Sequence, residues 1–272
     1  MEGTLPNRIS RLRKNFWDLM FLGFALSVLA FGLLRVRRDL RWSCWAGGDA
    51  MALNAAIHFA NEGFRNHYFL EYYHPGFLGK SVGNESPAGY YTRYPPLCAV
   101  FNGFLIRHFG DNPVLLKSVS VAIAVSGLAF GYLAFCSFFS KRVSFLSVLL
   151  IGGSVGFLQM MDAVCAYVYS EFFRFAILFF FLLWDSRKGG RTLRLLLFGT
   201  LWLLVYGECV NSLDYYFFPQ IFFWLYYALT GKKAPRAALF ALAAAPVAAF
   251  FTHFYLSVLA LRPFCLSAAD AL

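Results

Sequence analysis

The stretch LLKSVSVAIAVSGLAFGYLAFCSFF, residues 115–139, decides the class of fold. Its single charge is Lys117, and every other residue is apolar or small and uncharged. A helix needs roughly 20 mostly apolar residues to cross the hydrocarbon core of a bilayer. We therefore predict that this stretch is a transmembrane helix.

Similar apolar stretches recur along the whole chain. The 272 residues are 60% hydrophobic and 20% aromatic but only 14% charged, which leaves too little polar surface for a soluble domain. We predict an all-α polytopic membrane helical bundle of about seven transmembrane helices. The glycines of IGGSVGF are read as close helix packing inside one of these spans. The expected spans are 16–34, 115–139, 143–161, 167–184, 194–208, 215–230 and 237–260.

Basic residues indicate the orientation of this bundle. The net charge is +10, but most lysines and arginines stand in short clusters between apolar runs, which is typical of topology signals rather than of a nucleic-acid partner. With a cytoplasmic N-terminus, the short outer loops 161–167 and 208–216 contain no lysine or arginine. We therefore predict an integral protein of the cell's inner or plasma membrane with its N-terminus in the cytoplasm.

A long polar loop, 35–114, separates the first span from the remaining spans over 115–260. We expect it to be extracytoplasmic and to contain two interfacial helices, one from Ala50 to Glu62 and one after Pro96, because both apolar stretches are too short to cross. No internal repeat or low-complexity linker divides the chain, so 1–272 is treated as one domain.

Asp49 directly precedes the first of these interfacial helices, and two interpretations are open. Its carboxylate is suited to cap the helix by accepting a hydrogen bond from the second or third helical amide. Alternatively it is a catalytic carboxylate at the membrane surface. The two roles compete, because a general base needs a free lone pair.

The segment GYYTRYPPL, residues 89–97, joins the polar loop to the second interfacial helix. Arg93 is a candidate for binding a phosphate, since a guanidinium can hold two oxygens at once. The alternative for Arg93 is snorkelling to lipid headgroups, and for the tyrosines an aromatic belt. As further members of such a site we name Tyr91, Tyr94, His74 and Lys80.

Two charged residues lie within the fourth expected span. Glu171 and Arg174 are three apart and share a helix face, either as a self-satisfied pair or as the lining of a polar cavity. Glu208 and Asp214 fall on the same side of the membrane as Asp49, so an oxygen-rich divalent metal site is left open. No spacing is diagnostic of a metal, and no cofactor is predicted.

The order of these motifs resembles the GT-C membrane glycosyltransferases, in particular the branch of the protein O-mannosyltransferases and aminoarabinose transferases. The similar features are GDAMALNAAIHFANEG (48–63), YYTRYPPL (90–97), FGDNP (109–113) and the paired apolar stretches of 191–251. The resemblance covers roughly 16–260. Family members are longer, and they often have a second acid where this chain has Ala50.

The resemblance implies a sugar donor linked to polyprenyl phosphate, an unidentified acceptor, and an active site on the extracytoplasmic face. By position, Asp49 would be the general base, and one displacement would invert the sugar. Two other classes remain open: a transporter or flippase of lipid-linked saccharides, and a non-catalytic or truncated module. Transporters usually gather their polar residues near the bilayer midplane, whereas here they gather at one surface.

Overall fold

The computed structural model of the chain describes residues 5–37, 46–72, 90–91, 97–186, 190–212 and 217–261. These residues are almost entirely helical. The elements, in chain order, are α1 (Leu5–Arg35), α2 (Ala46–Glu62), β1 (Glu71–Tyr72), β2 (Tyr90–Tyr91), α4 (Leu97–Phe109), α5 (Pro113–Phe135), α6 (Lys141–Gly152), α7 (Val155–Met160), α8 (Ala166–Ser186), α9 (Arg191–Asn211), α10 (Phe218–Thr230) and α11 (Arg236–Leu261).

Five of these helices are long and apolar enough to cross a membrane. They correspond to the expected spans at 16–34, 115–139, 167–184, 194–208 and 237–260, so the helical class is confirmed together with five candidate membrane spans. The spanning stretches are Asn15–Arg35, Pro113–Phe135, Ala166–Ser186, Arg191–Asn211 and Arg236–Ala260.

The other two expected spans are short helices. Instead of one helix over 143–161, α6 ends at Gly152 and α7 starts at Val155, because the Ser154 side chain accepts a hydrogen bond from the Phe157 amide and caps a new helix. At 215–230 the helix α10 has 13 residues, about 20 Å, and Pro219 stands in its first turn. Seven crossings therefore remain a prediction.

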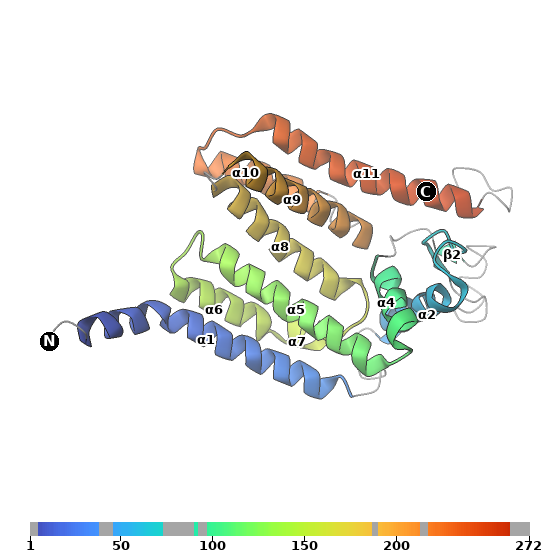
Figure 1. The fold of residues 1–272 in the computed structure, drawn as a ribbon, viewed down its shortest axis with the longest axis horizontal. Coiled ribbons are helices and arrows are strands. Elements are labelled where there is room, and N and C mark those ends of the chain that lie inside the picture. Colours follow the sequence, from blue (N-terminus) through green and yellow to red (C-terminus); the bar gives the residue numbers. More distant parts are fainter. Residues whose placement is uncertain are drawn as a thin grey trace.

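The long helices run up and down in chain order and form a bundle, with α2 and α4 packed together at one end (Figure 1). Across the bundle α1 contacts α5 and α6, α5 contacts α8, α8 contacts α9, and α9 contacts α11. Two apolar clusters fill it: one joins α1, α5, α6 and α8 around Val121 and Leu128, and the other joins α8 to α11 around Phe181 and Leu201. Large apolar side chains such as Leu150, Leu196 and Ile221 stay exposed, as lipid contact would require.

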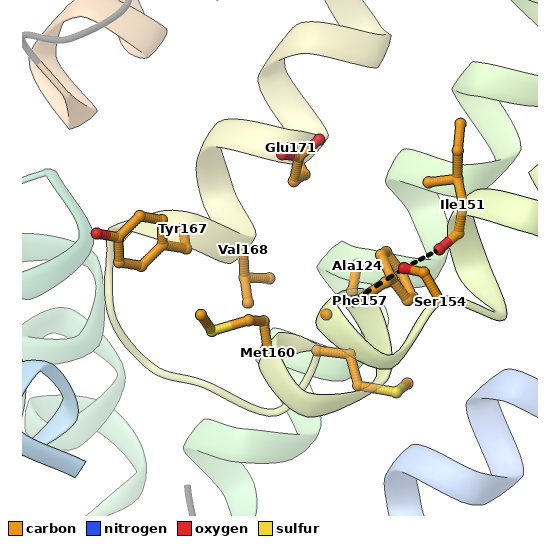
Figure 2. Close-up of a pocket in the computed structure, with 10 residues that line it drawn as sticks. Ala124, Ile151, Ser154, Phe157, Met160, Tyr167, Val168 and Glu171 are labelled. Carbon is orange, nitrogen blue, oxygen red and sulfur yellow. Dashed lines mark hydrogen bonds between the residues drawn. The ribbon is translucent and has the colours of Figure 1, made fainter. Parts of the chain in front are cut away.

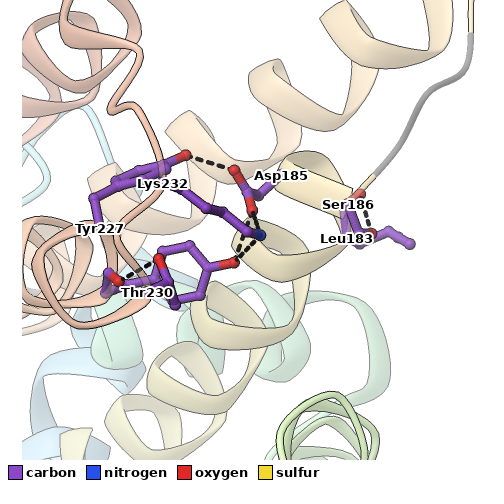
Figure 3. Close-up of polar contacts among 7 residues, drawn as sticks. Leu183, Asp185, Ser186, Tyr227, Thr230 and Lys232 are labelled. Carbon is purple, nitrogen blue, oxygen red and sulfur yellow. Dashed lines mark hydrogen bonds and ion pairs between the residues drawn. The ribbon is translucent and has the colours of Figure 1, made fainter.

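The end of the bundle away from α2 and α4 is basic. It carries the starts of α6 and α9 and the α10–α11 connection, and we call it the basic end, defined by Lys141, Arg142, Arg191, Arg194, Lys232, Lys233 and Arg236. Asp185, near the end of α8, connects α8 to α10 and to the α10–α11 connection at this end (Figure 3). Its carboxylate accepts hydrogen bonds from the hydroxyls of Tyr226 and Tyr227, each at 2.7 Å, and from Lys232 Nζ at 2.6 Å. We call the end of the bundle that holds α2 and α4 the α2–α4 end.

Candidate functional site

Asp49 lies at the α2–α4 end, in the first turn of α2, which begins at Ala46. The first of the two interpretations, that Asp49 is the N-cap residue directly before this helix, is therefore wrong. Its Oδ1 accepts hydrogen bonds from the backbone amides of Val164 at 3.0 Å and Cys165 at 3.2 Å, directly before α8 begins. The carboxylate thus satisfies amides at the N-terminal end of another helix, where a negative charge is favoured.

Asp49 is completely buried. Beside it, burial raises the pKa of the Cys165 thiol to about 12, and the negative charge of Asp49 adds to this rise. The Cys165 thiol is therefore protonated at neutral pH. In the geometry described, Asp49 is a structural acceptor that joins two helices, and a substrate reaches it only if these contacts open.

The turn Met161–Cys165, which we call the 161–165 turn, is held by two more elements. Asn102 of α4 donates from Nδ2 to the Val164 carbonyl at 2.8 Å and accepts from the Tyr169 hydroxyl at 3.1 Å. Arg35, at the end of α1, forms an ion pair with Asp162 at 3.1 Å and donates to the carbonyl of Leu158. The turn is consequently the point at which α1, α2, α4 and α8 meet.

A cavity of about 310 Å³ lies beside this turn (Figure 2). Its walls come from α5, from the α6–α7 junction, from Met160 and Met161, and from the first turns of α8. Most of the lining is apolar, with polar groups from Ser154, Tyr167 and Glu171. Because Ser154 is exposed, the cavity opens to the outside of the bundle.

Glu171 and Arg174 pair with each other as one of the two interpretations predicted, with Arg174 Nη1 at 2.8 Å from Glu171 Oε1. Arg174 Nε also lies 3.7 Å from Oε1 of Glu208, a fully buried carboxylate on α9. Among the described residues, neither oxygen of Glu208 has a hydrogen-bond partner. Two acids thus share one guanidinium, which leaves Arg174 poorly placed to bind an additional anion.

Several predicted site residues lie outside the described part of the chain: Arg93, Tyr94, His74, Lys80 and Asp214. Tyr91 belongs to β2, whose backbone pairs with Glu71 of β1. The meeting of Asp49 and Arg93 therefore stays a prediction. The oxygen-rich metal site also remains one, although neither Asp49 nor Glu208 joins a cluster of metal-type ligands within the described residues.

Sequence reasoning missed one cluster, formed by His58, Glu62 and His67. His58 and Glu62 are four apart on α2, a spacing that places them on one helix face and could have drawn attention to them. A hydrogen bond from His58 lowers the pKa of Glu62, and burial lowers the pKa of His67. Glu62 is therefore ionised and the His67 imidazole neutral at pH 7.

Comparison with known proteins found no matching family model for this chain. Searches of curated proteins and of solved structures also gave no match.

Proposed function

We propose that the protein is an integral-membrane glycosyltransferase that transfers a sugar from a polyprenyl-phosphate donor to an acceptor at the α2–α4 end. One observation carries the proposal: the 161–165 turn binds the Asp49 carboxylate through its amides, while Met161 in the same turn lines the cavity. A single turn therefore connects an acid to a largely apolar cavity.

The chemistry needs a base and a site that excludes water. Asp49 takes the proton of the acceptor hydroxyl as its oxygen bonds to the anomeric carbon. The bond from that carbon to the phosphate oxygen breaks, and polyprenyl phosphate leaves with the electron pair. The mostly apolar cavity suits the first prenyl units of such a donor. Since Asp49 is fully buried, the 161–165 turn must part from α2 when the donor binds.

Arg93 is the cation proposed for the leaving phosphate, and Tyr91, Tyr94, His74 and Lys80 would surround it. Glu171 lines the cavity and lies at 2.8 Å from Arg174, so these two would position the donor rather than bind its phosphate. No metal or other cofactor enters this scheme. The acceptor is left as a hydroxyl compound on the extracytoplasmic face.

Asp49→Asn tests the proposal. Purified protein is given a labelled polyprenyl-phosphate sugar and a membrane extract as a source of acceptor, and the released lipid phosphate is measured. Asparagine keeps an oxygen for the amides of Val164 and Cys165 but cannot take a proton, so the rate should fall by at least about 100-fold with little change in thermal stability. Asp111→Asn, at an exposed acid, is the control. An Asp49→Asn protein that is fully active would overturn the role of Asp49.

A second candidate is a non-catalytic module that binds lipid-linked saccharide. It is favoured by the complete burial of Asp49 and its two amide contacts. Gly156→Phe would fill the cavity from a position whose added Cβ meets nothing within 4 Å, and Gly199→Phe on α9 is a matched control. Donor binding that Gly156→Phe weakens, with no turnover by the unmodified protein, would favour this candidate.

A further inference from the structure

We propose that His58, Glu62 and His67 form a binding site for a divalent transition-metal ion of the zinc type, at the C-terminal end of α2. One ligand atom from each residue lies within 4.8 Å of the other two. The site is separate from Asp49 and from the cavity. The proposal is independent of the glycosyltransferase function.

The two imidazoles contact different oxygens of the Glu62 carboxylate, and their ring centroids lie 5.8 Å apart. His58 Nδ1 lies 2.5 Å from Glu62 Oε1, and His67 Nε2 lies 2.8 Å from Glu62 Oε2. Ligand atoms of a tetrahedral zinc ion, at about 2.0–2.1 Å from the metal, are about 3.3 Å apart. Each of these two contacts would have to lengthen by less than about 1 Å for an ion to enter. The two imidazole nitrogens, which lie within 4.8 Å of each other, would have to reach the same spacing, and small rotations of the three side chains can supply both changes.

The backbone after α2 brings His67 back to the helix. Gly63 has a φ of 96° and ends α2, and its amide bonds to the Phe59 carbonyl at 3.2 Å. The amide of Phe69 reaches the carbonyl of Phe64 at 3.0 Å, and that of Leu70 reaches the carbonyl of His67 at 2.8 Å. The ligands are therefore placed by main-chain hydrogen bonds, which is the preorganisation that a metal site needs.

Two residues directly after His67 adopt an unusual conformation. Tyr68 has a φ of 52° and Phe69 a φ of 55°, both in the left-handed region that side chains other than glycine and asparagine seldom adopt. Residues held in this region store conformational strain, and such strain gathers at functional sites. Here the two residues turn the chain directly after His67.

The site has both a protected side and an open side. The exposed fraction of the side chain is 7% for His67 and 17% for His58 but 49% for Glu62. An ion can enter past Glu62, and a water molecule can complete its coordination. Two histidines and one carboxylate with an open position are a ligand set that zinc accepts.

Metal binding to the intact protein tests the inference. Tag-free protein in detergent is titrated with zinc alone by calorimetry, and cobalt is added separately so that its visible absorption reports the coordination geometry. The wild type should bind one equivalent of zinc, with a four- or five-coordinate cobalt spectrum. No sugar donor is present in this titration, so a failure to bind metal does not contradict the proposed glycosyltransferase function. A failure of the glycosyltransferase assay likewise does not contradict the metal site.

Variants locate the ion. His58→Gln and Glu62→Gln should each weaken binding by more than about tenfold, since even loss of an outer-shell partner costs a metal site that much. His108→Gln, at an exposed histidine of α4, should bind as the wild type does. If His58→Gln fails to fold, the Glu62→Gln variant alone tests the inference. The Glu62 side chain is half exposed, so this substitution should leave the fold intact. No binding by the wild type, or unchanged binding by Glu62→Gln, overturns the inference.

Discussion

At the residue scale, the carboxylates of Asp49 and Glu208 are both completely buried, but they have different partners. Asp49 satisfies two amides at the 161–165 turn. Glu208 is equally buried but makes no hydrogen bond among the described residues, and its nearest described cation is Arg174 at 3.7 Å. Burial of an acid without such partners would be strongly unfavourable.

Asp49→Ala should lower the stability of the protein by about 2 kcal/mol or more, because a buried amide without an acceptor costs about 1–3 kcal/mol. Two amides, of Val164 and Cys165, lose their acceptor together. Thermal unfolding in detergent, followed by circular dichroism, measures the change. Asp49→Asn should be much milder and Asp111→Ala neutral. Equal loss in the Ala and Asn variants would contradict this account.

Arg174→Gln should destabilise the protein by about 1–3 kcal/mol, since it removes the hydrogen bond to Glu171 and the described cation nearest to the buried Glu208. Adding Glu208→Gln to the same chain should recover the part of the loss that comes from Glu208. Denaturant-induced unfolding of the single and double variants gives the coupling energy directly. Arg107→Gln, at an exposed arginine, is the control. Additive losses would show that Arg174 and Glu208 do not interact.

At the element scale, close contact between α5 and α8 depends on small residues. A Cβ added at Gly127 would lie 3.2 Å from Cα of Phe172, so the α5 backbone lies directly against that of α8. Helices in a bilayer associate through such contacts because lipid provides little hydrophobic drive between them. At Gly152 an added Cβ would meet Leu128 and Phe24 within 3.0 Å, so this glycine of IGGSVGF packs closely. At Gly156 it would meet nothing within 4 Å, and the stretch lies at the break between α6 and α7 rather than inside one span.

Gly127→Val should therefore destabilise the bundle by about 1–3 kcal/mol, the usual effect of overpacking. Gly23→Val on α1 is the matched control, because its added Cβ meets nothing within 4 Å. The fraction folded during a denaturant titration in detergent measures both. Similar stability of the two variants would mean that α5 and α8 are not held at the distance described.

At the scale of the whole molecule, the bundle has two chemically different ends. The basic end gathers seven lysines and arginines from three loops and helix starts, whereas the α2–α4 end holds Asp49, Asp162 and the His58 cluster. Basic loops stay on the cytoplasmic side of a membrane, so we expect the basic end to be cytoplasmic.

Labelling of introduced cysteines checks this orientation. In intact cells, a membrane-impermeant maleimide should label His108→Cys on α4 but should label Lys233→Cys at the basic end only after the membrane is made permeable. The chain without an added cysteine provides the background, since Cys98, Cys136, Cys165 and Cys209 are free thiols. The reverse pattern would mean that the bundle is inverted, and the candidate active site would then face the cytoplasm.

Much of the architecture could be predicted from the chain alone, because a long apolar stretch has few alternatives in a bilayer. The spans around 115–139 and 167–184 are examples, and the structure has α5 and α8 there. The break at Gly153–Ser154 could not be predicted in this way. It depends on a serine side chain that caps α7 within a stretch that is apolar on average.

Composition and periodicity thus determined the helical, membrane-type class of this protein, since hydrocarbon allows a chain to pass only when its backbone is internally hydrogen bonded. They also identified Glu171 and Arg174 as neighbours, because that contact is local to one helix. Tertiary structure alone decided what Asp49 binds. Its partners, Val164 and Cys165, are more than a hundred residues away, and hydrophobic pattern carries no information about which distant amide a carboxylate will meet.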